Sequence, residues 1–266
     1  MSHHEPSLKA QFYLTAPQPC AYLEGREERK VFTTLGGTSA VSVNNALSQK
    51  GFRRSQSVIY RPACVGCSAC MSIRIPVEAF KPSRSQRRTL NRNQDLTRRP
   101  CEAWATENQF ALFRKYLNAR HANGGMADMD AFDYASMVDE TPVNSMVIEY
   151  LNQDPETGES YLAAACLSDV LNDGLSMVYS FFDPDLAHRS IGSFMILDHI
   201  EMARSMGLAH VYLGYWVSGS KKMDYKIGYR PFQLCDGTRW HQFDGRADFE
   251  TWQMDRYVAI QDRLLG

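Results

Sequence analysis

The sequence contains no run of eighteen apolar residues that could cross a bilayer as a helix. Its first residues, MSHHEPSLKAQFYL, lack the basic segment followed by an apolar segment that marks a secretory signal. The 29 Lys and Arg residues nearly balance the 30 Asp and Glu residues, so no overall charge attracts nucleic acid. We therefore expect a soluble, cytoplasmic protein without a membrane partner, in which any polyanion binds to a local patch.

Common catalytic motifs are also absent. The chain has no G-x-S-x-G, no H-E-x-x-H and no P-loop, and it shows neither repeats nor low-complexity segments. Its 266 residues, 44% of them apolar, are enough for one large core or two modest ones. These features indicate a globular protein whose chemistry does not depend on a familiar triad.

Seven cysteines are present, three of them in the stretch CVGCSAC. An odd number of cysteines in a reducing compartment argues against a disulfide framework. Cys64, Cys67 and Cys70 have the two-residue gaps that turn thiolates toward one ion, and Cys20 is available as a fourth ligand. The spacing predicts a structural zinc ion or an iron–sulfur cluster, against the alternative of buried reduced thiols. The other cysteines, which lack partners at ligand spacing, are predicted to fill the core: Cys101, Cys166 and Cys235.

A strongly basic segment, KPSRSQRRTLNRNQDLTRR, carries a single acid. Ser85 can cap a helix that starts at Gln86, which would place several guanidinium groups close together. Arginine binds phosphate through a planar fork, and phosphate neutralises the repulsion between clustered cations. We predict an RNA-binding surface here, against the alternative of a solvated helix. The predicted contacts to tRNA are Arg84, Arg87, Arg88 and Arg92.

The pattern of elements predicts an α+β fold with two regions. In the first, the β-type segments FYLTA, KVFTT, RRSQSVIYR and CMSIRIPV accompany a helix over AVSVNNALSQKG. In the second, MVIEYL, YLAAACLSDV and SMVYSFFDP predict an antiparallel meander. A helix over SIGSFMILDHIEMARSMG, the strand HVYLGYW, a short helix and the strand PFQLC follow. We expect a smaller N-terminal module with the cysteine cluster and the basic helix at 1–103, and a transferase domain at 104–266.

The order of elements in the second region resembles the acetyltransferase fold of the GNAT type. That resemblance implies a wedge between two diverging strands that binds an acyl donor, with the donor's phosphates at the turn before the central helix. Here the turn reads HRSIGSF, which keeps Arg189 and Gly192 but lacks the second glycine of a CoA cradle. We therefore expect a donor whose phosphates are bound by the basic segment.

Several long blocks resemble the bacterial aspartate/glutamate leucyltransferases, within the arginyl-tRNA–protein transferase family. Among them are LSQKGFRRSQSVIYRPACVGCSACMSIRIPV, YLNARHANGGM, DGLSMVYSFFDPDLAHRSIGSF and VYLGYWVSGSKKMDYKIGYRP, and the similarity covers nearly the whole chain. The resemblance implies transfer of leucine from leucyl-tRNA to the α-amine of proteins beginning with Asp or Glu. The product would be an N-degron for downstream degradation machinery. The choice of leucine over arginine rests on the resemblance to the bacterial branch.

Such a reaction needs little machinery, because the aminoacyl ester is already activated and a peptide α-amine has a pKa of about 8. Holding two substrates together, removing one proton and stabilising an oxyanion suffice, so we expect no cofactor for the chemistry. The catalytic candidates are Tyr179, Asp183 and Lys226, at strand ends or on the short helix of the wedge. The structural alternatives are a core tyrosine, a turn-forming aspartate and a solvated lysine.

Recognition of an acidic first residue requires a cation or a fork of donors near the amine. The predicted set is Arg53, Arg54 and His121, with Arg74 and Arg120 as further candidates. Because adjacent residues of a strand point to opposite faces, only one of the first two is expected to face the pocket.

Two other functions stay open from the residues alone. One is a non-catalytic, zinc-containing RNA-binding protein, and the other is a CoA-dependent N-acetyltransferase.

Overall fold

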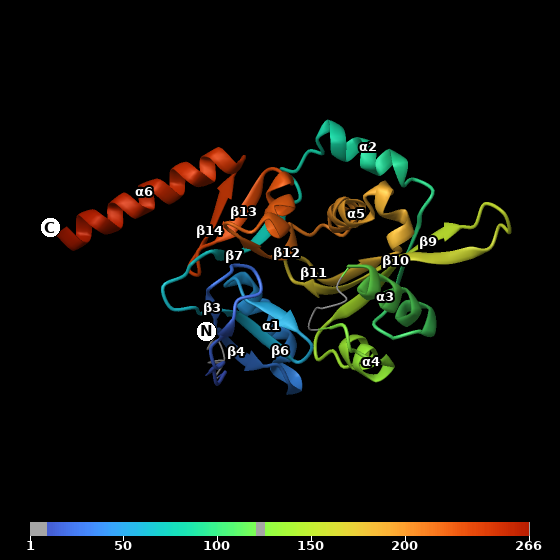
Figure 1. Ribbon diagram of the computed structural model, residues 1–266, viewed down its shortest axis with the longest axis horizontal. Coiled ribbons are helices and arrows are strands. Elements are labelled where there is room, and N and C mark those ends of the chain that lie inside the picture. The colour runs from blue at the N-terminus through green and yellow to red at the C-terminus, as the bar shows by residue number, and fades with distance from the viewer. Residues whose placement is uncertain (1–9, 121–125, 266) are drawn as a thin grey trace, which may run out of the picture.

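The computed structural model describes residues 10–120 and 126–265, with side chains up to residue 255 (Figure 1). Its centre is an eight-stranded mixed sheet in the order β14-β13-β7-β12-β11-β10-β9-β8. The strands are β7 (Cys70–Pro76), β8 (Thr97–Glu102), β9 (Ser145–Gln153), β10 (Ser160–Leu171), β11 (Gly174–Phe182), β12 (His210–Val217), β13 (Phe232–Cys235) and β14 (Trp240–Phe243). The predicted α+β class is confirmed.

All neighbouring strands of this sheet are antiparallel except β11 and β12, which are parallel. The parallel pair requires a crossover connection, and α5 (Ile191–Ser205) supplies it. The predicted meander is present as β9, β10 and β11, and it leads into α5 and β12 as expected. The central helix and its two flanking strands therefore position the site described below.

The large sheet has an apolar cluster on each face because side chains alternate along its strands. Ala164 and Cys166 of β10 pack in the cluster that contains the α5 residues, such as Met195. Ala165 and Leu167 pack in the opposite cluster, with α3 (Glu107–Arg120) and α4 (Ala131–Asp139). Figure 1 shows α5 and α2 (Arg84–Arg92) on one side of the sheet, and the N-terminal elements with α4 on the other.

The N-terminal elements form a second, four-stranded sheet in the order β1-β4-β6-β5. It consists of β1 (Tyr13–Leu14), β4 (Lys30–Thr34), β5 (Arg53–Ser55) and β6 (Val58–Pro62). A single turn, η1 (Gly37–Ser39), leads into α1 (Ala40–Gln49), which buries Val43 against this sheet. Separately, β2 (Gln18–Pro19) pairs with β3 (Glu27–Glu28). Gly51 ends α1 with a φ of +80°, and a Cβ atom there would lie 2.9 Å from Sγ of Cys235. The small sheet thus packs closely against the large one.

The sheets do not divide the chain at residue 103, where we expected a domain boundary. Both β7 and β8 precede that position, yet they are strands of the large sheet, and β7 lies between β12 and β13. Strand pairing between distant segments decides this arrangement, and no local pattern encodes it.

The basic helix begins earlier than we predicted. Ser83, not Ser85, is its N-cap: Ser83 Oγ accepts from the N–H of Gln86 at 3.3 Å, and Oε1 of Gln86 accepts from the N–H of Ser83 at 2.8 Å. This reciprocal capping box fixes α2 to begin at Arg84. The sequence patterns also gave no prediction for β8, α4, β14, the turn η2 (Pro184–Arg189) or the C-terminal helix α6 (Arg246–Leu265). Among the described residues, no helix combines the length and apolar composition that a membrane span requires.

Candidate functional site

The large sheet opens between β11 and β12. These strands pair at Gly174 with His210, Leu175 with Val211 and Ser176 with Tyr212, and the pairing then stops although both strands continue. Beyond these pairs the facing backbone groups of β11 and β12 no longer bond each other. The two strands therefore form a wedge that opens toward their carboxyl ends.

Arg53 of β5 fills this wedge from the side of the N-terminal sheet. Its Nη2 donates to the carbonyl oxygen of Met177 at 3.3 Å and to that of Val178. Both carbonyls lie on β11 just beyond its last pair with β12, so the guanidinium contacts β11 where the two strands have separated. Among the described residues, no carboxylate forms an ion pair with Arg53. The wedge therefore contains a half-buried cation whose charge no described carboxylate matches.

Lys226 lies beside the same wedge, on η3 (Lys221–Gly228), which follows β12. Its side chain is only 6% exposed, and Nζ donates to the carbonyl oxygen of Tyr215 at 2.6 Å. Burial, together with the charge of Arg53, lowers the pKa of Lys226 to about 7. The structural alternative, a solvated lysine, does not apply. An amine with this pKa is able to accept or donate a proton near neutral pH.

Tyrosines surround these two cations. Tyr22 and Tyr225 are 39% and 53% exposed, and Lys226 Nζ lies 5.8 Å from the ring centre of Tyr225. Burial raises the pKa of both tyrosines, and the charge of Arg53 opposes that shift. The wedge thus combines aromatic surface with positive charge.

The basic helix α2 spans the turns that follow the two diverging strands. At its beginning, Nε2 of Gln86 donates to the carbonyl oxygen of Gly228, at the end of η3. At its end, Nη1 of Arg92 donates to the carbonyl oxygen of His188 at 2.8 Å, in η2. The buried amide of Asn93 bonds Arg189 through both of its polar atoms. The arginine predicted at the phosphate turn, Arg189, therefore fastens α2 and pairs with Asp95.

The four predicted tRNA contacts are all exposed on α2. Nη1 of Arg87 donates to the carbonyl oxygen of Pro82 at 2.6 Å, and Arg92 donates to His188. Within the described ranges, the side chains of Arg84 and Arg88 make no ion pair. The helix therefore presents positive charge beside the wedge.

The structure places other candidates elsewhere. Arg54 is 3% exposed, and it binds both oxygens of Asp169, each at 2.6 Å, and the carbonyl oxygen of Gln56. Its charge is matched in this buried pair, so Arg54 joins β5 to β10 and does not face the wedge. Arg74 is likewise held, by Gln233 at 2.7 Å and over the ring of Trp240 at 4.2 Å.

Two catalytic candidates have structural contacts. Asp183 accepts from the N–H of Asp185 at the start of η2, and its Oδ1 lies 2.7 Å from Nζ of Lys115. Tyr179 packs edge-on against Phe113, and burial raises its pKa. His121 lies outside the described residues, while the neighbouring Arg120 is exposed and 5.3 Å from the ring of Phe182, at the end of β11.

The four predicted metal ligands are half-buried free thiols in one region of the structure. Burial, followed by the proximity of Cys64, Cys20 and Cys67, raises the pKa of Cys70 to about 12. In the part of the chain that the structure describes, no group of three His, Cys, Asp or Glu side chains is placed to hold a metal ion. The thiols as arranged do not fit the predicted zinc or iron–sulfur centre.

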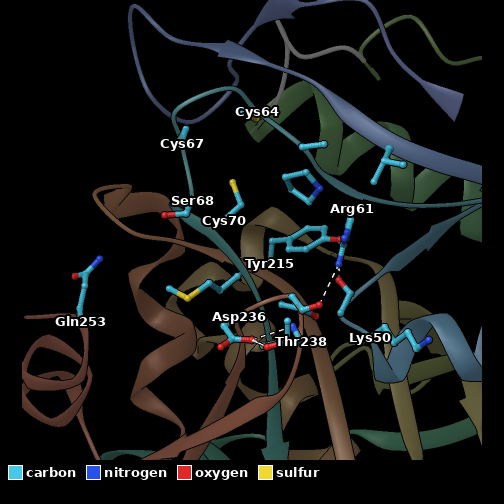
Figure 2. A pocket seen from close by; sticks show the side chains of 18 of the residues that line it. Lys50, Arg61, Cys64, Cys67, Ser68, Cys70, Tyr215, Asp236, Thr238 and Gln253 are labelled. Carbon is cyan, nitrogen blue, oxygen red and sulfur yellow. Dashed lines mark hydrogen bonds between the residues drawn. The ribbon is translucent and has the colours of Figure 1, made fainter. Parts of the chain in front are cut away.

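Cys64, Cys67 and Cys70 border a cavity of about 630 Å³ between the loop before β7 and the β13–β14 turn. Figure 2 shows Cys64, Cys67 and Cys70 along this loop, with Arg61 and Tyr215 facing the same hollow. The hydroxyl of Tyr215 donates to the carbonyl oxygens of Gly51 and Tyr60, at 3.0 and 2.9 Å. Since the carbonyl of Tyr215 holds Lys226, this residue contacts both the cavity and the lysine of the wedge.

Sequence reasoning missed Tyr22, Tyr225 and Gly214 as parts of the wedge. The two tyrosines carry no local signal, because only folding brings them near Arg53. Gly214 did have a signal: an isolated glycine inside the strand HVYLGYW indicates a bulge or a close backbone approach.

Comparisons with known proteins show similarity along most of the chain. Residues 18–88 match the N terminus of the arginine-tRNA-protein transferase family, and residues 108–236 match its C terminus. An aspartate/glutamate leucyltransferase of Cereibacter sphaeroides is 55% identical over 256 residues, which cover 95% of this chain and 91% of that protein. The Ruegeria pomeroyi protein of the same name is 57% identical over 237 residues, covering 89% and 85% of the two chains.

Among solved structures, FemX is 10% identical with a TM-score of 0.47, over 81% of this chain and 70% of that one. The sequence relatives are far closer, and they span almost the whole length. The family resemblance drawn from the sequence blocks is confirmed, and the chain belongs to the aspartate/glutamate leucyltransferases of the arginine-tRNA-protein transferase family.

Proposed function

We propose that the protein transfers leucine from leucyl-tRNA to the α-amine of proteins that begin with Asp or Glu. One observation carries the proposal beyond family membership. A guanidinium without a carboxylate partner among the described residues and a lysine of lowered pKa lie in one wedge, beneath a helix of exposed arginines. This combination suits a reaction between an RNA ester and an acidic peptide.

On the donor side, the phosphates of the tRNA acceptor end bind the exposed arginines of α2. The aminoacylated 3′ end then enters between β11 and β12, whose splay corresponds to the acyl-donor wedge of a GNAT-type fold. Because α2 contacts both η2 and η3, its arginines border the opening on the side of α5. RNA bound there needs only its flexible 3′ end to reach Lys226.

On the acceptor side, Arg53 pairs with the Asp or Glu side chain through N–H groups that Met177 and Val178 do not use. The α-amine nitrogen attacks the ester carbonyl carbon, and neutral Lys226 takes a proton from that nitrogen. The tetrahedral intermediate then loses the ribose oxygen, which receives the proton from Lys226. A new peptide bond and free tRNA result, without any cofactor.

Neither alternative function is favoured by a specific contact. Arg189 lies in the turn at which a GNAT-type fold binds the donor's phosphates, and here it is bound to Asn93, Asp95 and the end of α2. The thiols, as far as the described residues go, do not fit the zinc site that the RNA-binding alternative assumes. We further propose that the reaction takes place in the cytoplasm. The product carries an N-degron, because the added leucine precedes the acidic residue and becomes the new N-terminal residue.

The test is a transfer assay with purified full-length protein. Leucyl-tRNA or arginyl-tRNA is incubated with peptides that differ only in their first residue: Asp, Glu, Asn or Ala. We expect leucine on the Asp and Glu peptides alone, as measured by mass spectrometry. Transfer of arginine, or acetylation from acetyl-CoA in a parallel reaction, would overturn the proposal.

A further inference from the structure

Gly214 lies at an irregular point of β12, directly against the wedge. The register between β12 and β7 shifts between Tyr212 and Tyr215, so β12 has one residue more than its partner here. Gly214 also has a φ of +74°, in the left-handed region that favours glycine. The strand therefore bulges at its only glycine.

The missing side chain of Gly214 provides the space that the guanidinium of Arg53 occupies. A Cβ atom on Gly214 would lie 1.3 Å from Nη1 of Arg53 and 2.5 Å from its Cζ. Non-bonded atoms do not approach so closely, so a side chain at position 214 and the guanidinium in the wedge exclude each other. On the opposite side, the carbonyl oxygens of Met177 and Val178 hold Nη2.

We propose that Gly214 is a specificity-determining positioning residue: its bulge and bare Cα form a slot that seats Arg53 to receive the acidic first residue of the acceptor. The identity of the ligand rests on the proposed function, whereas the slot itself rests on geometry. One wall of the slot is Gly214, and the other consists of the two β11 carbonyls. Because Nη2 donates to the two carbonyls, the ligand binds the N–H groups of the guanidinium that these carbonyls do not use.

A methyl group at position 214 should evict the guanidinium without unfolding the chain. The clashing atoms belong to the flexible end of Arg53, which is half-buried and can swing out of the wedge. The left-handed backbone adds strain, and Gly207→Ala serves as the matched control for it. Gly207 has a φ of +69°, and no atom lies within 4 Å of a Cβ placed there.

The first measurement is the Kd of a peptide beginning with Asp, determined without tRNA by fluorescence anisotropy. We expect Gly214→Ala to weaken binding roughly 10- to 100-fold, the size expected for losing hydrogen bonds to a charged group. Gly207→Ala should bind like the unaltered protein, and the KM for leucyl-tRNA should change little in either variant. Equal peptide binding by Gly214→Ala and Gly207→Ala would overturn the inference.

The second measurement separates seating of Arg53 from a general effect on the fold. Arg53→Ala and Arg53→Ala/Gly214→Ala should bind the peptide equally weakly, since the slot has nothing left to seat. Guanidine added to Arg53→Ala should fill the slot and restore peptide binding. Guanidine should not restore binding by the double variant, because the introduced methyl group occupies the slot. Additive losses, or equal rescue of both variants, would contradict the inference. If Gly214→Ala alone fails to fold, the double variant, which lacks the clash, should still fold.

These outcomes are distinct from failure of the proposed function. Absence of leucine transfer by the unaltered protein would reject that function, while the binding cycle would still report on the slot.

Discussion

At the scale of single residues, the wedge separates two neighbouring arginines by their surroundings. Arg53 makes neutral hydrogen bonds to backbone carbonyls and keeps its charge, whereas the charge of Arg54 is neutralised by Asp169. The alternation of a strand puts them on opposite sides, so only one is able to meet a substrate. The charge of Arg53 also lowers the pKa of Lys226, after the larger effect of burial, because like charges disfavour protonation.

We expect the rate of transfer to rise with pH through about 7, because the base form of Lys226 appears above its pKa of about 7. Lys226→Met should lower kcat by about 10²- to 10⁴-fold and remove this inflection. Lys226→Arg should be equally inactive, since arginine stays charged. The pH profile of kcat for the unaltered protein and both variants checks this. An inflection near 7 that persists in Lys226→Met would assign it to another group.

Lys226 should also make stability depend on pH. Its pKa is lowered from 10.5 in the unfolded chain to about 7 when folded, so the unfolded state binds more protons between these values. Stability should therefore rise as pH increases from about 7 to above 10, and Lys226→Met should lose this dependence. Denaturant midpoints at several pH values measure it, and parallel curves for both proteins would show that Lys226 is not buried as described.

Because Arg54 is buried in a pair with Asp169, changing it should lower stability and leave peptide binding unchanged, whereas changing Arg53 should weaken peptide binding. Each side chain is 1% exposed, so Arg54→Met strands a carboxylate in the interior and should cost about 3–5 kcal/mol of unfolding free energy. Arg54→Met/Asp169→Leu should recover most of it. Urea denaturation gives the energies, while peptide KM in the folded range should stay unchanged. A raised peptide KM in the stable double variant would indicate that Arg54 does contact the substrate.

At the scale of elements, α2 links the turns after the two diverging strands. Its capping box sets where the helix begins, and the buried Asn93 fixes its end against Arg189. Because both ends are held, the exposed arginines between them keep a constant position relative to the wedge.

Changing Arg87 and Arg88 to Ala should raise the KM for leucyl-tRNA and leave the KM for the peptide unchanged. Two lost phosphate contacts should reduce the slope of log affinity against log salt by about 1.5–2. Exchanging Lys50 and Arg239, exposed cations near the β13–β14 turn, for Ala is the control. Steady-state kinetics at several salt concentrations test this, and equal changes in peptide and tRNA KM would place the RNA elsewhere.

At the scale of the whole molecule, the two regions share one sheet. β7 comes from the first region and pairs with β12 and β13 of the second. Further contacts cross the same junction, including the hydrogen bonds from Trp240 to Gln49 and from Asn172 to Asn45. The wedge depends on this junction, because Arg53 and Lys226 come from opposite parts of the chain.

A fragment of residues 104–266 should therefore not fold alone. Without β7, both β12 and β13 lose their central partner, and buried side chains such as Ile73 and Ile75 leave the core. We expect an insoluble or non-cooperative fragment in thermal unfolding followed by circular dichroism, with the full chain as control. A sharp transition in the fragment would establish residues 104–266 as an independent domain.

Local patterns in the sequence were sufficient to predict the family, the meander, the central helix and the presence, though not the first residue, of the basic helix. Each of these depends on periodicity, capping or contiguous blocks, which survive without knowledge of distant contacts. The sequence also singled out Arg53 and Lys226 as candidates, although it could not separate them from Arg54 and Asp183. Residue type and spacing define which chemistry is available, but not which side chains meet.

Which side chains meet depends on the folded chain. The insertion of β7 into the large sheet, the bonds from Arg53 to β11 and the burial of Lys226 all result from contacts between segments far apart in the sequence. The cysteine triplet is a second case in which spacing in the sequence did not predict which side chains meet. Its spacing is typical of a metal site, yet among the described residues no three ligating side chains are placed around one position. Burial and charge proximity belong to three-dimensional surroundings, and the linear order of residues does not specify them.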